Sequence, residues 1–262
     1  MKPTWEKDGI RLYLGDCRDV LPHLENSIDL VITSPPYNCG MDYGICSDSL
    51  PVKEYFAWFE EVFCHVAKTV KQSGRMAVNV PSWIGSRSDQ VFAFDEYRAI
   101  LDRLMFFRDA IVWDKGPPNG AAWGNYPTSP RIRAGHEWIL VYQLGTGSTG
   151  KSDISWEDWS RFTQSLWRVP ASLPYGKEHP ATFPVEIPNR LALLYSPSCG
   201  QVLDPLAGSG TTIEACVRLG RKCVGIEKNP EFFDLIVRRA EKAVTAERLN
   251  LFKNEKTESG VT

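Results

Sequence analysis

The stretch "VLDPLAGSGTTIEACVRLGRKCVGIEKNPEFF", residues 202–233, places a short apolar run, a glycine loop, a helical pattern and a second apolar run in succession. This is the order of a nucleoside-binding βαβ unit. Gly208 and Gly210 allow a ligand to approach the backbone closely, and a helix beginning at Thr211 directs its amide end toward a ligand carboxylate. Glu227 ends the second strand, where its carboxylate can accept hydrogen bonds from ribose hydroxyls.

Two other ligand loops fit this stretch less well. A phosphate-binding P-loop requires GxxxxGK[ST], and "GSGTT" has neither that spacing nor the lysine. A nicotinamide-dinucleotide loop requires GxGxxG, and Ile213 stands where its third glycine belongs. Both alternatives are therefore disfavoured.

The rest of the chain continues the alternation of strand and helix. Apolar runs and amphipathic patterns predict a parallel sheet covered by helices. The strands are expected in residues 10–16, 28–34, 74–80, 109–116, 136–144, 201–208 and 222–228, and the helices in 52–71, 94–106, 186–195, 211–220 and from 230 onward.

One region differs in composition from both of its flanks. Residues 116–178 are rich in Gly, Pro, Ser, Trp and Arg and contain a single strand-like run, "HEWILVYQL". We therefore predict four segments: the catalytic half of the core in 1–115, an inserted target-recognition region in 116–178, the cofactor-binding half in 179–249 and a flexible tail in 250–262.

The composition is that of a soluble globular protein. The 262 residues are 43% hydrophobic and 24% charged, and the net charge of −2 means that a nucleic-acid partner would require a local basic surface. Seven cysteines without a CxxC pair argue against a secreted disulfide framework and favour a reduced cytoplasm. Neither a signal peptide nor a membrane-spanning run is evident, and no clustered ligands predict a metal site.

The strand "LVIT" runs straight into "SPPYN", residues 34–38. Two consecutive prolines stop a strand and create a stiff corner with free carbonyls, because proline lacks a backbone donor and fixes φ. Such a corner suits a binding site, although an ordinary strand-terminating loop is the alternative.

Three separated motifs now define a resemblance. "TSPPY" (residues 33–37), "HPATFP" (179–184) and "DPLAGSGTT" (204–212) together resemble the β-class of DNA amino-methyltransferases, which use S-adenosylmethionine to modify exocyclic amines. The resemblance spans about residues 10–245. It implies a class I methyltransferase fold, an α/β Rossmann-like, mostly parallel sheet with helices on both faces, circularly permuted so that the catalytic motif precedes the cofactor motif.

The first motif suits methylation of an amine. The exocyclic amine of a base is a poor nucleophile because its lone pair delocalises into the ring. The Ser34 side chain and the Pro35 carbonyl can accept its two protons, Pro36 stiffens the corner, and Tyr37 is expected to stack on a base that has rotated out of the duplex. The predicted catalytic residues are therefore Ser34, Pro35, Pro36 and Tyr37.

The target base is less firmly specified. Within the family, Ser before PPY leans toward N4 of cytosine and Asp toward N6 of adenine. We therefore expect N4-cytosine methylation, with N6-adenine as the alternative. A C5-cytosine enzyme would need a Pro-Cys dipeptide, and the chain has none. An RNA or small-molecule methyltransferase and a non-catalytic DNA-binding relative are further alternatives.

The resemblance implies that three segments and the glycine loop hold the cofactor. Asp16 follows a strand and could equally cap a helix, and His179 could equally be structural. The predicted cofactor-binding residues are Asp16, Cys17, Thr182, Phe183, Pro184, Asp204, Pro205, Leu206, Ala207, Gly208, Ser209, Gly210, Thr211, Thr212, Glu227 and Lys228, with His179 and Ala181 as neighbouring candidates.

Contacts to DNA are expected from the catalytic corner and the recognition region. Trp113 corresponds to an aromatic residue that some relatives place against the flipped base, with sheet packing as the alternative. Scattered basic residues suit phosphate contacts, although a solvated loop explains them equally well. The predicted substrate-binding residues are Asn38, Trp113, Lys115, Arg131 and Arg133.

The resemblance also implies the protein's partners. They are double-stranded DNA and, functionally, a cognate restriction endonuclease, for a monomer or homodimer in a prokaryotic or phage-like cytoplasm.

Overall fold

A computed structural model of the chain describes residues 1–44, 48–85, 90–116, 123–125, 128–131, 134–171 and 182–258. For 123–125, 129–131 and 249–258 it describes the backbone alone.

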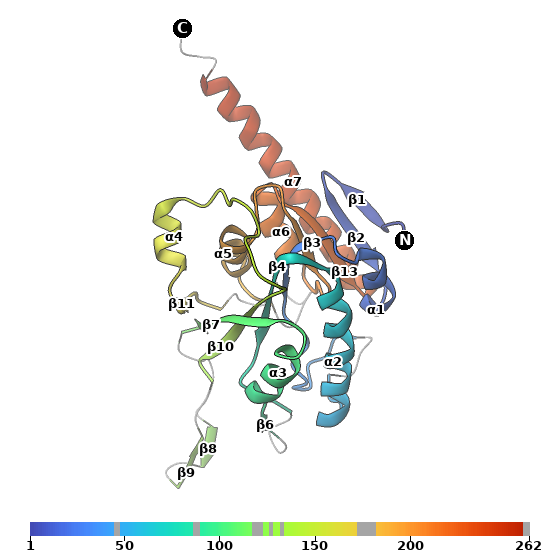
Figure 1. The fold of residues 1–262 in the computed structure, drawn as a ribbon, viewed down its shortest axis with the longest axis vertical. Coiled ribbons are helices and arrows are strands. Elements are labelled where there is room, and N and C mark those ends of the chain that lie inside the picture. Colours follow the sequence, from blue (N-terminus) through green and yellow to red (C-terminus); the bar gives the residue numbers. More distant parts are fainter. Residues whose placement is uncertain are drawn as a thin grey trace.

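A nine-stranded sheet forms the centre of the fold (Figure 1). The strands from β2 to β4 in this sheet run parallel to one another, and β10 runs antiparallel to both of its neighbours. The cofactor-loop strand β12 comes late in the chain but lies in mid-sheet. In spatial order the strands are β1 (Trp5–Lys7), β2 (Ile10–Leu14), β13 (Lys222–Glu227), β12 (Gln201–Asp204), β3 (Ile28–Thr33), β4 (Val70–Val80), β10 (His136–Gln143), β7 (Phe106–Asp114) and β11 (Leu166–Arg168).

Helices cover both faces of this sheet. One face carries α1 (Cys17–Val20), the 3-10 helix η1 (Leu21–Leu24), α2 (Val52–Thr69) and α3 (Phe94–Leu101). The other carries α4 (Trp156–Phe162), α5 (Glu186–Tyr195), α6 (Thr211–Arg218) and α7 (Pro230–Glu258). Two small hairpins stand apart from the sheet, β5 (Trp83–Ile84) with β6 (Val91–Phe92), and β8 (Trp123–Asn125) with β9 (Ser129–Arg131).

The two cores follow from alternation along the strands. In β3, Val31 packs with the α2 side, whereas Leu30 and Ile32 pack with the α5 and α6 side. Successive side chains of a strand point to opposite faces, so strands with both faces covered are apolar at nearly every position. The expected α/β fold with a mostly parallel sheet and helices on both faces is confirmed.

Three boundaries differ from the sequence prediction. Strand β4 begins at Val70, directly after α2, rather than at residue 74. The predicted insertion 116–178 contains strands β10 and β11, which pair within the central sheet, so the sheet extends into this range. The backbone of α7 stays helical to Glu258, well past residue 249, because the polar tail consists largely of good helix formers.

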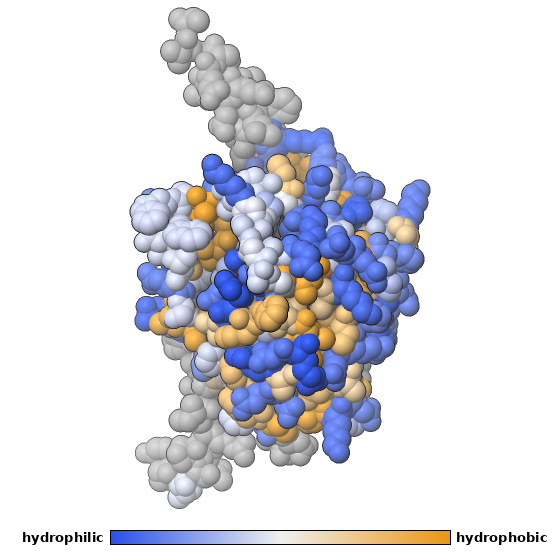
Figure 2. Space-filling model, in the orientation of Figure 1, coloured by the Kyte–Doolittle hydropathy of each residue, from blue (hydrophilic) through white to orange (hydrophobic). Residues whose placement is uncertain are grey.

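The surface is mainly hydrophilic, with an apolar region over β7 and α3 on the face shown in Figure 2. Phe106 and Phe107 of β7 are 65% and 37% exposed. Among the described residues, no helix has both the length and the apolar character needed to span a bilayer.

Candidate active site

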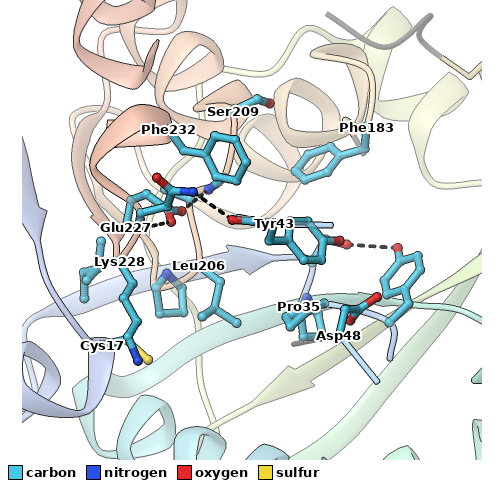
Figure 3. Close-up of a pocket in the computed structure, with 18 of the residues that line it drawn as sticks. Cys17, Pro35, Tyr43, Asp48, Phe183, Leu206, Ser209, Glu227, Lys228 and Phe232 are labelled. Carbon is cyan, nitrogen blue, oxygen red and sulfur yellow. Dashed lines mark hydrogen bonds between the residues drawn. The ribbon is translucent and has the colours of Figure 1, made fainter. Parts of the chain in front are cut away.

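A cavity of about 530 Å³ lies where the parallel strands end (Figure 3). Gly15, Ser34, Pro205 and Lys228 each follow one of the strands β2, β3, β12 and β13, which run parallel and therefore end at the same edge. Most of the predicted site residues line it: Asp16, Cys17, Ser34, Pro35, Pro36, Tyr37, Asn38, Trp113, Lys115, Thr182, Phe183, Pro205, Leu206, Ala207, Gly208, Ser209, Thr211, Glu227 and Lys228.

The glycine loop between β12 and α6 needs glycine for two reasons. Gly210 has a φ of +78°, a left-handed conformation, and a Cβ there would lie 3.1 Å from the side chain of Ile236. The Gly208 amide donates a 2.8 Å hydrogen bond to a carboxylate oxygen of Glu227. The loop thus packs closely against Ile236 of α7 and is hydrogen-bonded to Glu227 at the end of β13.

Four predicted cofactor residues do not line the cavity: Pro184, Asp204, Gly210 and Thr212. Asp204 is buried beneath the loop, where it accepts hydrogen bonds from the Thr212 hydroxyl at 2.7 Å and the Leu206 amide at 3.2 Å. Burial raises the pKa of Asp204 to about 6. Asp204 and Thr212 therefore support the loop from behind, and Gly210 packs against α7.

Glu227 and Asn229 form the next part of the wall. The two oxygens of Glu227 accept the amides of Gly208 and Asn229, both at 2.8 Å. Burial raises the pKa of Glu227, although these amide bonds oppose the shift. A carboxylate can accept about four hydrogen bonds, so Glu227 retains acceptor capacity for a ligand in the cavity.

Asp16 caps a helix, as the alternative interpretation held. Its carboxylate accepts the Arg18 amide at 3.0 Å, the Arg18 guanidinium at 2.8 Å and the Lys228 ammonium at 3.2 Å. These interactions, led by the side-chain bond from Arg18, hold the pKa of Asp16 well below its usual range. Lys228 thus pairs with Asp16 at the rim, and burial raises the pKa of the Cys17 thiol to about 12.

Aromatic rings close the upper side of the cavity in Figure 3, where Phe183 and Phe232 lie across from Leu206. The Thr182 hydroxyl oxygen beside them is buried and has no hydrogen-bond partner among the described residues. An orphaned polar atom in a cavity wall is suited to bind a ligand. Phe232 was not predicted from the sequence.

The catalytic corner is held by a hydrogen-bonded group of side chains, two of which, Asn79 and Glu137, were not predicted from the sequence. The Tyr37 hydroxyl lies 2.9 Å from the Ser34 hydroxyl and 2.8 Å from a Glu137 carboxylate oxygen. The Asn79 side-chain nitrogen lies 2.6 Å from the Tyr37 hydroxyl and 2.7 Å from the same Glu137 oxygen. Desolvation and the Glu137 charge raise the pKa of Tyr37 well above its ordinary value, so the phenol stays protonated.

The antiparallel direction of β10 explains why Glu137 was missed. The beginning of β10, rather than its end, lies at the cavity edge, and this places Glu137 beside Trp113 of β7. A buried charge in an otherwise apolar strand was the available signal, since charged residues are seldom buried without partners. Asn79 is a buried polar residue without a charge in the apolar end of β4, which is a weaker signal of the same kind.

The predicted substrate residues Lys115 and Trp113 both line the cavity and have internal partners. The Lys115 ammonium donates to the second Glu137 oxygen at 2.7 Å. The Trp113 indole is buried and donates to the Val169 carbonyl at 2.7 Å. The Trp113 indole nitrogen is therefore bonded within the protein, as the sheet-packing alternative expects, and Trp113 also lines the cavity.

The Asn38 side chain is hydrogen-bonded to the backbone of Leu50. Its side-chain nitrogen donates to the Leu50 carbonyl at 2.8 Å and its oxygen accepts the Leu50 amide at 2.7 Å. Its own amide donates to Asp48 at 2.7 Å. Asn38 is 3% exposed and these bonds fix the loop that follows the motif, although the residue also lines the cavity. Its predicted role in substrate binding stays a prediction.

Several predicted residues lie outside what the structure describes. Arg133, His179 and Ala181 are outside the described residues, and Arg131 is described only as backbone in β9. Within the described part of the chain, no three or more His, Cys, Asp or Glu side chains gather in a way that could hold a metal ion.

Comparison with known proteins adds family relationships to this geometry. A family model for DNA methylases of the N6/N4 type matches residues 28–238. The type II methyltransferase M.ScaI of Streptomyces caespitosus is 27% identical over 271 residues, covering 96% of this chain and 86% of that protein.

Solved structures show the same architecture. TTHA0409 of Thermus thermophilus, provisionally described as a DNA modification methylase and solved with S-adenosyl-L-methionine, superposes with a TM-score of 0.72 at 27% identity, covering 89% of this chain and 94% of that one. The PvuII DNA methyltransferase, described as cytosine-N4-specific, has a TM-score of 0.73 at 22% identity, with 93% of each chain covered. The latter likeness concerns the fold alone.

Proposed function

The chain belongs to the N6/N4 DNA methylase family, and from that premise we propose that it methylates the N4 amine of cytosine in double-stranded DNA after the base has rotated out of the helix. It is an S-adenosylmethionine-dependent DNA amino-methyltransferase with type II relatives. The choice of cytosine N4 over adenine N6 is the proposal.

The chain's residues fit the cofactor. S-Adenosylmethionine supplies an electrophilic methyl group on a sulfonium. We assign Glu227 to the ribose hydroxyls, because its buried carboxylate retains acceptor capacity at the end of β13. The orphaned Thr182 hydroxyl and the close-packed glycine loop suit the amino-acid end of the ligand, and Phe232 and Phe183 offer apolar surface.

Ser34 is the observation that carries the cytosine assignment. The resemblance associates a serine before PPY with N4 of cytosine, and Ser34 and Pro35 both line the cavity. In our proposal Ser34 and the Pro35 carbonyl accept hydrogen bonds from the two amine N–H groups and aim the nitrogen lone pair at the methyl group. As the nitrogen–carbon bond forms, the methyl–sulfur bond breaks, which leaves S-adenosylhomocysteine, and the methylated nitrogen loses one proton to solvent. Tyr37 contributes its ring to the base, and Trp113 and Lys115 line the same end.

We further propose that DNA contacts outside the cavity come from the parts of 116–178 that flank β10, with Arg131 and Arg133 on the phosphates. The division of the chain into two halves of the core, a recognition region and a flexible tail, with boundaries at 115, 178 and 249, is also a proposal. So are a monomeric or homodimeric state, a cognate restriction endonuclease and a prokaryotic or phage-like cytoplasmic location.

Identification of the methylated nucleoside tests this function. Purified protein is incubated with S-adenosylmethionine and unmethylated genomic DNA, which is then digested to nucleosides and analysed by mass. We expect N4-methyldeoxycytidine. N6-methyldeoxyadenosine would retain the family activity and overturn the cytosine assignment, and an unmodified digest would overturn DNA methylation itself.

A further inference from the structure

The direction of the hydrogen bonds at the catalytic corner follows from counting protons. Glu137 is 8% exposed and receives three donors: the Lys115 ammonium at 2.7 Å, the Asn79 nitrogen at 2.7 Å and the Tyr37 hydroxyl at 2.8 Å. A carboxylate surrounded in this way only accepts. Tyr37 has one phenolic proton, and it donates this proton's hydrogen bond to Glu137.

The bond between Tyr37 and Ser34 then has one possible direction. Because the Tyr37 proton is committed to Glu137, the Ser34 hydroxyl must be the donor in the 2.9 Å contact with the Tyr37 oxygen. The chain of donors runs from Ser34 to Tyr37 to Glu137. Ser34 has a single hydroxyl proton, so its oxygen offers only lone pairs in every other direction.

Asn79 supplies the remaining hydrogen-bond donors of this group. Its two N–H groups donate to the Tyr37 oxygen at 2.6 Å and to Glu137 at 2.7 Å, so the Tyr37 oxygen accepts from both Asn79 and Ser34. The reverse orientation of the amide would place two acceptors 2.7 Å apart, which fixes the nitrogen toward Glu137. The 3.4 Å contact from Asn79 to Ser34 is long for a hydrogen bond.

We propose that Glu137 is a positioning residue for methyl transfer: through Tyr37 it turns the Ser34 proton away from the target amine, so that Ser34 acts only as an acceptor. The inference rests on the proposed function, since it requires an exocyclic amine at Ser34. It applies equally to cytosine N4 and adenine N6. In this arrangement the two N–H groups of the amine face only hydrogen-bond acceptors. A Ser34 proton aimed at the amine nitrogen would instead occupy the nitrogen lone pair that has to attack the methyl group.

Glu137→Gln tests this with little change in shape. The amide can donate to the Tyr37 oxygen, which frees the Tyr37 proton for Ser34 and reverses the chain. We expect kcat to fall about 10- to 100-fold, with KM for DNA and affinity for S-adenosylmethionine within about twofold of the wild type.

The chain contains a matched control. On the same strand, the Tyr142 hydroxyl donates to Asp102 at 2.7 Å, and Arg98 pairs with that carboxylate at 2.9 Å. This is the same tyrosine–carboxylate–cation arrangement, and its residues do not line the cavity. Asp102→Asn should therefore lose an interaction of the same kind, at a more exposed carboxylate, while keeping wild-type turnover.

A double-mutant cycle shows whether Glu137 acts through Ser34. Ser34→Ala combined with Glu137→Gln should turn over at the rate of Ser34→Ala alone, measured in single-turnover reactions with labelled methyl groups, because the residue to be oriented is gone. If Glu137 had a purely structural role, the fold-losses in turnover of the two single variants would instead multiply in the double variant. If Glu137→Gln does not fold, Tyr37→Phe breaks the same chain by removing one oxygen, and the same loss is expected.

The outcomes separate the two claims. If the wild-type protein methylates DNA but Glu137→Gln or Tyr37→Phe leaves kcat unchanged, the inference is overturned and the proposed function stands. The same holds if the losses of the two single variants multiply in the double variant. Wild-type protein that methylates no base in DNA overturns both.

Discussion

The side-chain nitrogen of Asn229 donates a 2.8 Å hydrogen bond to the backbone carbonyl of Tyr43, although 186 positions separate the two residues in the sequence. Asn229 follows β13 in the cofactor half, and Tyr43 belongs to the loop after the catalytic motif. Figure 3 shows the Tyr43 ring between Glu227 and Pro35. The bond thus joins the two halves of the cavity.

Asn229→Ser isolates this bond. Serine can still cap α7 by accepting the Glu231 amide, as the Asn229 oxygen does at 2.9 Å, but is too short to reach Tyr43. Loss of one hydrogen bond of about 0.5–1.5 kcal/mol should weaken S-adenosylmethionine binding by up to about tenfold in calorimetry. Asn229→Ala, which also loses the cap, should unfold at a lower temperature than Asn229→Ser. Wild-type affinity in Asn229→Ser would refute the coupling.

Asp204 should make stability depend on pH. Burial raises its folded pKa from 3.8 to about 6, so its contribution is fully present below about pH 4 and is lost as pH rises through 6. The free energy of unfolding of the wild type, relative to Asp204→Asn, should fall by up to about 3 kcal/mol between pH 4 and pH 7. Urea denaturation of both proteins across this range measures the difference, and parallel curves would show that Asp204 does not titrate there.

The alternation of buried side chains made most of the fold predictable. A βαβ unit with a glycine loop implies neighbouring parallel strands, and β12 and β13 lie side by side and parallel as that order requires. The place of β10 was not predictable in this way. Its partners β4 and β7 are distant in sequence, and a strand that returns antiparallel carries no local mark of its direction.

The same distinction applies to the site. Motif residues were predictable because each follows its own strand at the shared edge, as Ser34 and Pro205 do. Glu137 was not, because its contact with Tyr37 spans 100 positions and depends on the direction of β10. The bonds between Asn38 and Leu50, and the left-handed φ of 53° at Asn38, were likewise not predictable, because they depend on how the loop after the motif folds back.

Tyr37 variants should separate the ring from the hydroxyl. Tyr37→Phe keeps the stacking surface and breaks the chain from Ser34 to Glu137, so turnover should fall while melting temperature changes little. Tyr37→Ala should lose a further 1–3 kcal/mol or so through stacking, seen as weaker binding of a flipped base. Tyr142→Phe is the matched control on β10. A stable Tyr37→Ala enzyme with the parental rate would remove both roles from Tyr37.

Arg131 and Arg133 should act on DNA without affecting the cofactor. If both touch phosphates, neutralising them together should weaken DNA binding and reduce the slope of log K against log salt by up to about two. Binding to duplex DNA at several salt concentrations measures the slope, and calorimetry with S-adenosylmethionine serves as the control. DNA affinity that is unchanged at every salt concentration would assign both arginines to a solvated surface.

The most direct measurement compares wild-type protein with Ser34→Ala in a host that lacks DNA methylation of its own, with nucleosides from the genomic DNA identified by mass. We expect N4-methyldeoxycytidine with the wild type and at most a small fraction of it with Ser34→Ala. The purified variant should bind S-adenosylmethionine normally, since the hydrogen bonds that Ser34 makes within the described residues go to Tyr37 and Asn79 rather than to the glycine loop. Equal amounts of N4-methyldeoxycytidine from both proteins, or none from the wild type, would contradict this expectation.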